Sequence, residues 1–209
     1  MLKKTASGVA AGLLISIGGA VFLACDNKYI GAGLFTVALL CICLKGYSLF
    51  TGKVGFIPEQ HDKDTVETLL LGLLGNLVGT MLGGYAILLS QPKLSDTAYT
   101  LCEKKLELLT ASPALGIFQV LLRGVFCGIL MYLAVSIYRD KNKIVGILFC
   151  IPVFILAGFE HSIADMFYFA ASGMIDLRAT AFIWIVIAGN ALGAMILPGL
   201  SMIKSKPQK

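Results

Sequence analysis

Charged residues are scarce in this sequence of 209 residues: Asp, Glu, Lys and Arg together make up 14% of it. Soluble domains carry about 25% charged residues. At the same time 57% of the residues are hydrophobic, and the mean hydropathy is +0.86. So few charges could not cover that much apolar surface in water. The composition excludes a disordered chain, a nucleic-acid-binding arm and a secreted disulfide scaffold, and it leaves an integral membrane protein.

The sequence also lacks the spacings that metal sites and hydrolytic enzymes use. Its six cysteines form no CxxC pair, and neither histidine stands at ligand spacing. A buried free cysteine behaves as a small apolar side chain, so we interpret the cysteines as packing residues. There is no HExxH motif and no nucleophile beside a base. We therefore expect no metal, no cofactor and no catalytic residues, and an intramembrane enzyme that uses Glu160, His161 and Asp165 is a remote alternative.

No polar stretch is long enough to form a domain of its own, since the longest covers about residues 91–112. A membrane-spanning helix needs about 20 mostly apolar residues. We therefore predict a single all-helical transmembrane domain over residues 1–209. Its six apolar segments cover about residues 6–24, 30–47, 68–89, 114–137, 144–169 and 179–203. A lipoprotein signal peptide is the alternative for the first segment, because Lys3 and Lys4 precede an apolar run that ends at Cys25.

Basic residues indicate how the spans are oriented, because cytoplasmic loops are enriched in Lys and Arg. When the N-terminus is placed inside, ten basic residues lie in cytoplasmic segments and five lie outside. We expect both termini to be cytoplasmic in a plasma or inner membrane, and we expect no nucleic-acid partner. The inside residues are Lys3, Lys4, Lys53, Lys63, Arg139, Lys141, Lys143, Lys204, Lys206 and Lys209, and the outside residues are Lys28, Lys93, Lys104, Lys105 and Arg178.

Two short sequences recur at nearly the same separation. Residues 75–79 (GNLVG) match residues 189–193 (GNALG) 114 positions later, and residues 7–14 match residues 123–130 after 116 positions. The common offset predicts a repeat of three spans, over about residues 6–90 and 114–203. Because three is odd, the halves must be inverted relative to each other, which is typical of transporters and channels. The alternative is that these small-residue patterns only pack helices together.

The second apolar segment is followed by residues that interrupt a helix. Gly52, Gly55 and Pro58 come soon after Tyr47, within an otherwise apolar run. Non-helical backbone at membrane depth persists only where it is buried in protein or lines a cavity. We therefore predict that the second helix is interrupted, with a plain surface loop as the alternative.

The fifth segment contains three ionisable residues, Glu160, His161 and Asp165. Each would cost several kcal/mol if it faced lipid, so we expect them to face a cavity or one another. A histidine there can hydrogen-bond when neutral and attract an anion when protonated, and imidazole ordinarily titrates near neutral pH. The alternative is a polar cluster that only ties helices together.

Residues 158–164 (GFEHSIA), followed by Met166 and Phe167, closely resemble the fifth-helix signature of the formate/nitrite transporter family. Residues 49–51 (LFT) resemble the loop that interrupts that family's second helix. The two Gly-Asn-x-x-Gly runs, and Arg123-Gly124 followed by Cys127, also fit. The resemblance implies homopentamers of aquaporin-like protomers. Each protomer would have its own pore between inverted three-helix repeats and would pass formate, nitrite, hydrosulfide, lactate or similar small monovalent anions.

The resemblance also implies roles for individual residues. His161 would be the central pore histidine, and Thr51 would face it from the broken second helix. Glu160 would anchor His161 or its loop. The inner constriction would consist of Leu49, Phe50 and Met131, and the outer one of Phe35, Leu39 and Phe154; the supporting residues would be Glu160, Asn76, Asn190 and Asp165.

The sequence departs from the family pattern at three places. The family commonly has a Lys near the start of the fourth helix, but residues 112–116 contain none, and Lys104 and Lys105 lie upstream. Gly128 and Asp165 stand where many members have Asn. These changes remove attraction for an anion, and Asp165 adds repulsion if it ionises and faces the pore.

The expected function is therefore a pH-dependent channel or transporter for small monovalent anions or their weak acids, with protons and the lipid bilayer as its other partners. A neutral acid crosses an apolar constriction far more easily than a bare anion. His161 would supply or relay the proton. The alternative is a pore for small neutral solutes such as water, glycerol or urea, because the Lys and Asn are missing.

Overall fold

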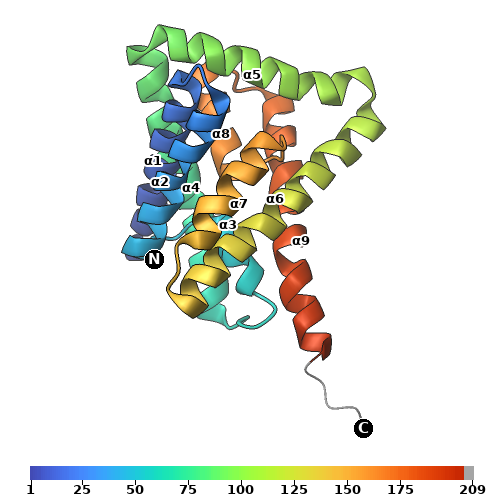
Figure 1. Ribbon diagram of the computed structural model, residues 1–209. Helices are drawn as coiled ribbons and strands as arrows, with labels where there is room; N and C mark the ends of the chain where they lie inside the picture. Colours follow the sequence, from blue (N-terminus) through green and yellow to red (C-terminus); the bar gives the residue numbers. More distant parts are fainter. Residues whose placement is uncertain (205–209) are drawn as a thin grey trace.

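The computed structural model describes residues 1–204, apart from the side chains of Ala111 and Lys204. Within this part of the chain all regular elements are helices, and there are no strands. Lys206 and Lys209, which were counted as cytoplasmic, lie outside the described residues. In chain order the elements are α1 (Leu2–Ala24), α2 (Lys28–Lys45), α3 (Phe50–Lys53), the short 3-10 helix η1 (Val54–Phe56), α4 (Lys63–Ser90), α5 (Pro92–Ala111), α6 (Pro113–Lys141), α7 (Val145–Leu156), α8 (Ser162–Ser172) and α9 (Leu177–Lys204) (Figure 1).

Five of these helices, namely α1, α2, α4, α6 and α9, are long and apolar enough to cross a membrane. The second predicted segment ends two residues early, at Lys45, because Gly46 adopts the left-handed conformation with φ 68° and terminates α2. The fifth predicted segment is divided into α7 and α8. Neither of these helices is long enough to span a bilayer alone.

The polar stretch before the fourth predicted span forms a helix of its own, α5, which contains 20 residues. It lies across the end of the molecule opposite the end where α1 begins and α9 finishes (Figure 1). Ala98, Cys102 and Leu106 recur every four residues and are buried, which gives α5 one apolar face. This face packs against α8 and α6, so the stretch is held by the bundle rather than by a core of its own.

The sequences that match between the two halves form two close helix crossings. A Cβ atom on Gly75 would collide with the carbonyl oxygen of Thr5, which brings α1 and α4 into backbone contact. In the second half, a Cβ atom on Gly128 would collide with the carbonyl oxygen of Asn190, where α6 crosses α9. Gly128 therefore faces α9 and not a cavity, which corrects the expectation that this position influences anion attraction.

Candidate functional site

An asparagine on α4 holds the backbone where the second predicted span is interrupted. Asn76 Oδ1 accepts a hydrogen bond from Phe50 N at 2.9 Å. Its Nδ2 donates to the carbonyl oxygens of Ser48 at 2.8 Å and of Gly8 at 2.9 Å. Ser48, Leu49 and Phe50 are buried, so a plain surface loop is the wrong interpretation of this segment.

An asparagine on α9 makes the corresponding bonds at the break between α7 and α8. Asn190 Oδ1 accepts from Ser162 N at 2.9 Å, and its Nδ2 donates to the carbonyl oxygens of Glu160 at 2.8 Å and Gly124 at 2.9 Å. Both asparagines have no exposed surface. Each amide therefore satisfies three backbone groups that would otherwise be buried without partners.

The two breaks meet at a hydrogen bond between Thr51 and His161. Thr51 Oγ1 lies 2.8 Å from His161 Nε2, and both side chains are buried. His161 Nδ1 accepts from Ala164 N at 3.1 Å and so caps the start of α8. A backbone N–H can only donate, so Nδ1 carries no proton and the neutral ring has its proton on Nε2. Nε2 then donates to Thr51, and the threonine hydroxyl hydrogen remains available to a third group.

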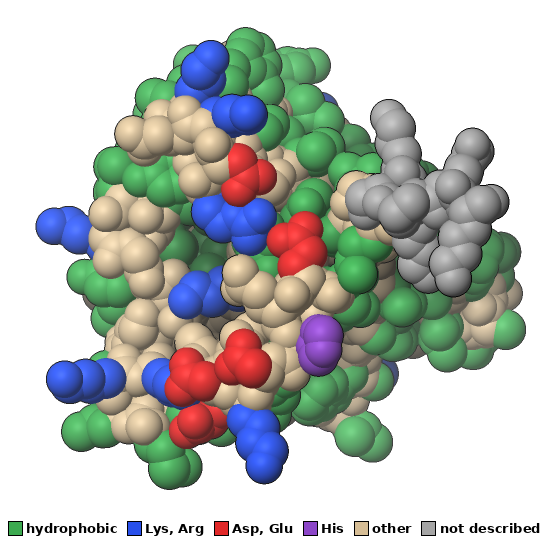
Figure 2. Space-filling model, turned by 90° about the horizontal axis from the view of Figure 1, so that it is seen from below, with side chains coloured by type: hydrophobic (Ala, Val, Ile, Leu, Met, Phe, Trp, Pro, Cys, Tyr) green, Lys and Arg blue, Asp and Glu red, His purple; other side chains and the backbone are tan. Residues whose placement is uncertain are grey.

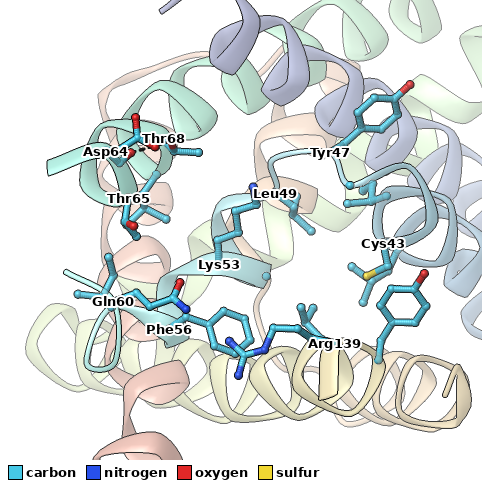
Figure 3. Close-up of a pocket in the computed structure, with 18 residues that line it drawn as sticks. Cys43, Tyr47, Leu49, Lys53, Phe56, Gln60, Asp64, Thr65, Thr68 and Arg139 are labelled. Carbon is cyan, nitrogen blue, oxygen red and sulfur yellow. Dashed lines mark hydrogen bonds between the residues drawn. The ribbon is translucent and has the colours of Figure 1, made fainter. Parts of the chain in front are cut away.

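Two cavities approach this pair from opposite ends of the molecule. The upper cavity, beside α5, has a volume of about 240 Å³, and the side chains that line it include His161, Phe35 and Phe154. The lower cavity, beside α3, has a volume of about 480 Å³ and is lined in part by Leu39 and Leu49 (Figure 3). The Phe154 ring is stacked on the imidazole of His161, with ring centroids 5.6 Å apart.

The expected constriction residues are all buried, but they do not divide as expected between the two cavities. Leu39, expected in the outer constriction with Phe35 and Phe154, borders the lower cavity together with Leu49. Phe50 and Met131 belong to the hydrophobic core and line neither cavity. Apolar side chains therefore separate the two cavities around Thr51 and His161.

The upper cavity contains a cluster of buried charges that the sequence pattern only partly indicated. Lys105 Nζ contacts Glu160 Oε2 and lies 3.1 Å from Asp165 Oδ1. Arg123 Nη1 lies 3.9 Å from Glu160 Oε1. The cation that pairs with both acids therefore comes from α5, upstream of the fourth predicted span. Glu160 and Asp165 in an apolar span were the sequence feature that could have indicated a nearby cation, because buried carboxylates need a positively charged partner.

Asp165 lines the upper cavity, as does Glu160. Its Oδ1 faces Lys105, whereas its buried Oδ2 has no hydrogen-bond partner among the described residues. Among the described residues, the Lys105 ammonium group therefore pairs with two carboxylates, and Arg123 makes a further, long contact with Glu160. Among the described residues no group of three or more His, Cys, Asp or Glu side chains is arranged to hold a metal ion.

Replacement of Lys105 by methionine should destabilise the protein strongly. It would leave Glu160 and Asp165 buried without their ammonium partner, and removing one partner of a buried ion pair costs about 3–5 kcal/mol. We expect the melting temperature of the purified protein to fall by about 10 °C. Lys104→Met is the matched control, because Lys104 is the exposed neighbour and has no ion pair among the described residues. A Lys105→Met variant that melts like this control would contradict the prediction. Adding Asp165→Asn should recover part of the loss.

The lower cavity is lined by residues from α2, α3, α4 and α6 (Figure 3). On one side the Arg139 guanidinium lies over the Phe56 ring, 3.8 Å from its centroid. Asp62 caps the start of α4, and hydrogen bonds from the side chain and backbone of Thr65 hold the pKa of the Asp62 carboxyl below its usual range. Figure 2 shows that basic and acidic side chains gather on this end of the molecule, with hydrophobic side chains around them.

Comparison with known proteins identifies the family. A model of the family described as "Formate/nitrite transporter" matches residues 1–203. The chain belongs to the formate/nitrite transporter family. It is therefore a multi-pass membrane protein of a transporter family, as the motif around His161 had suggested.

Several curated transporters resemble the chain over most of its length. It is 30% identical over 177 residues to the uncharacterized transporter YwcJ of Bacillus subtilis, covering 76% of this chain and 66% of that protein. It is 30% identical to formate-nitrite transporter 2 of Toxoplasma gondii, covering 83% of this chain but 40% of that protein. It is 27% identical to the nitrite transporter NirC of Salmonella typhimurium, covering 83% and 70%. The chain thus spans less than two thirds of the length of the first two relatives.

Solved structures support the family's fold for this chain. A pentameric formate channel with formate bound superimposes with a TM-score of 0.76 at 21% identity, covering 98% of each chain. An ion channel of the same family superimposes equally well, at 22% identity. At this level of identity the comparison establishes the fold alone.

Proposed function

We propose that this protein forms a transmembrane pore for small monovalent anions or their weak acids, such as formate, nitrite or hydrosulfide. The observation that carries the proposal is the hydrogen bond between Thr51 and His161. It joins two interrupted helices, and His161 lines the upper cavity while Leu49 and Gly52, on either side of Thr51, line the lower one. A pair of hydrogen-bonding groups between two cavities, with apolar side chains around the pair, suits a small polar solute that must shed its water.

The proposed architecture is a set of six spans in two inverted repeats, with α2 and α3 as the second span and α7 and α8 as the fifth. The matching bonds of Asn76 and Asn190 support this arrangement, because each amide joins a break to a close helix crossing. We propose that the termini and the lower cavity face the cytoplasm. We also propose a homopentamer, which would cover part of the many apolar side chains exposed on the single chain, Trp184 among them.

In the proposed mechanism the anion enters the upper cavity, where Lys104 and Arg123 attract it. It then meets the free hydroxyl hydrogen of Thr51 and the Nε2–H group of His161. Full dehydration of a charged solute is far more costly than that of a neutral one, so the anion crosses largely as its neutral acid. To pass on a proton, His161 must accept one at Nδ1, which breaks the bond from Ala164 N, and must release another from Nε2. Flux should therefore rise as the pH on the entry side falls.

The direct test is solute flux into proteoliposomes that contain the purified protein. Formate, nitrite, hydrosulfide and glycerol would each be tested between about pH 5 and pH 8, the range over which histidine ordinarily titrates. Saturable flux of one anion that increases at low pH, with glycerol excluded, is the expected result. Glycerol flux without anion flux would overturn the proposal in favour of a pore for neutral solutes.

A further inference from the structure

The lower cavity contains a lysine that the mechanism above does not use. Lys53 ends α3, four residues after Leu49, and its half-buried side chain runs toward Leu49 along the cavity (Figure 3). Its Nζ donates one hydrogen bond, to Ser48 Oγ at 3.1 Å. Ser48 Oγ also accepts from Ser7 at 3.4 Å, so Ser48 brings no negative charge to the ammonium group.

The other charged groups that line the lower cavity are paired. Asp64 lies 2.7 Å from Lys4 Nζ. Arg139 lies 2.8 Å from Asp140 and 3.6 Å from Glu59, and it also covers the Phe56 ring. Lys53, in contrast, has no carboxylate within 4 Å among residues 1–204. It is therefore an uncompensated positive charge in a partly apolar cavity, where attraction for an anion is stronger than in water.

We propose that Lys53 is an anion-docking residue of the lower cavity, where it holds a small monovalent anion beside Leu49 on the lower side of Thr51 and His161. The ammonium group has three N–H donors, of which Ser48 uses one. The remaining donors can bind a carboxylate or nitrite oxygen in place of water. This inference rests on the proposed function, because it assigns to that pore a second binding site at its lower end.

If an anion docks at Lys53, the apparent affinity of the protein for that anion should depend on Lys53 only when the anion is supplied from one side of the membrane. We expect Lys53→Met to raise the KM for formate about tenfold when formate is supplied from the lower-cavity side. The maximal rate should stay within about twofold, because the Lys53 ammonium group bonds to Ser48 and takes no part in the hydrogen bond between Thr51 and His161. Lys53→Arg keeps the charge and should keep the KM.

The experiment measures initial rates of formate and nitrite flux against concentration in right-side-out and inside-out membrane vesicles. Lys63→Met is the matched control, because Lys63 is an exposed lysine at the start of α4 that lines neither cavity. If the Lys53→Met variant fails to insert into the membrane, Lys53→Gln is used in its place. Comparison with Lys53→Arg then still shows the effect of the positive charge on the KM. A KM that equals the control's from both sides, or a fall in maximal rate at constant KM, would overturn the docking role alone. Absence of anion flux in the wild type would instead overturn the proposed function, and the docking site with it.

Discussion

Replacement of Asn190 by leucine is expected to prevent stable folding or to lower the free energy of unfolding by about 3–9 kcal/mol. Leucine has a similar size but cannot hydrogen-bond, so Ser162 N, Glu160 O and Gly124 O would remain buried without partners. Each such group costs about 1–3 kcal/mol. Since Ser162 begins α8, the start of that helix and the position of His161 would be lost together.

Thermal unfolding and size-exclusion chromatography of the purified variant would measure this effect. Asn76→Leu should cause a loss of the same order, because Asn76 makes the equivalent three bonds. Gln119→Leu is the control, since Gln119 is an amide on the exposed surface of α6. An Asn190→Leu variant as stable as this control would show that the three hydrogen bonds do not hold the break.

Replacement of His161 by asparagine is expected to reduce anion flux about a hundredfold while leaving the fold intact. Asparagine is a favourable N-cap and can still accept the hydrogen bond from Ala164 N. It has no ring nitrogen that could take up and release a proton, and positioned proton transfer contributes roughly 10²–10⁴-fold to rates. The variant therefore separates the structural role of His161 from its proposed role in proton transfer.

The pH profile decides between these two roles. Wild-type flux should rise as the pH falls, whereas His161→Asn should retain only the dependence that comes from the amount of neutral acid in solution. His61→Asn is the matched control, because His61 is the other histidine and lies exposed in the loop before α4. His161→Phe, which removes the cap as well, should also lower the melting temperature. A His161→Asn variant with the rate and pH profile of the wild type would rule out the proton relay.

Much of this protein could be predicted from its sequence, because membrane-spanning helices are dictated by local hydrophobicity. Apolar runs of about 20 residues can satisfy their backbone in lipid only as helices, and the structure has long apolar helices at five of the six expected places. In the structure α2 ends at Lys45 and α7 at Leu156, close to the glycine, proline and ionisable residues that make a continuous lipid-facing helix costly. The GFEHSIA motif was sufficient to indicate the family, which the comparison then established.

What the sequence alone could not determine is which distant groups meet. Lys105 and Glu160 are 55 positions apart, and the sequence around each residue does not indicate that they are in contact. Their contact exists because α5 packs across the end of the bundle against α8. In the same way, the sequence suggested that glycine at position 128 removes attraction for an anion, whereas the structure places Gly128 at the crossing of α6 and α9, against Asn190.

Local hydrophobicity is enough to indicate that the chain is a helical membrane protein and where its apolar helices lie, because these properties depend on the cost of transferring each short segment into lipid. Helix packing, in contrast, brings Thr51 to His161 and Lys105 to Glu160 and Asp165. It also leaves Lys53 without a carboxylate within 4 Å among residues 1–204. These contacts depend on the register in which the helices pack. Backbone contacts between glycines far apart in the chain set that register.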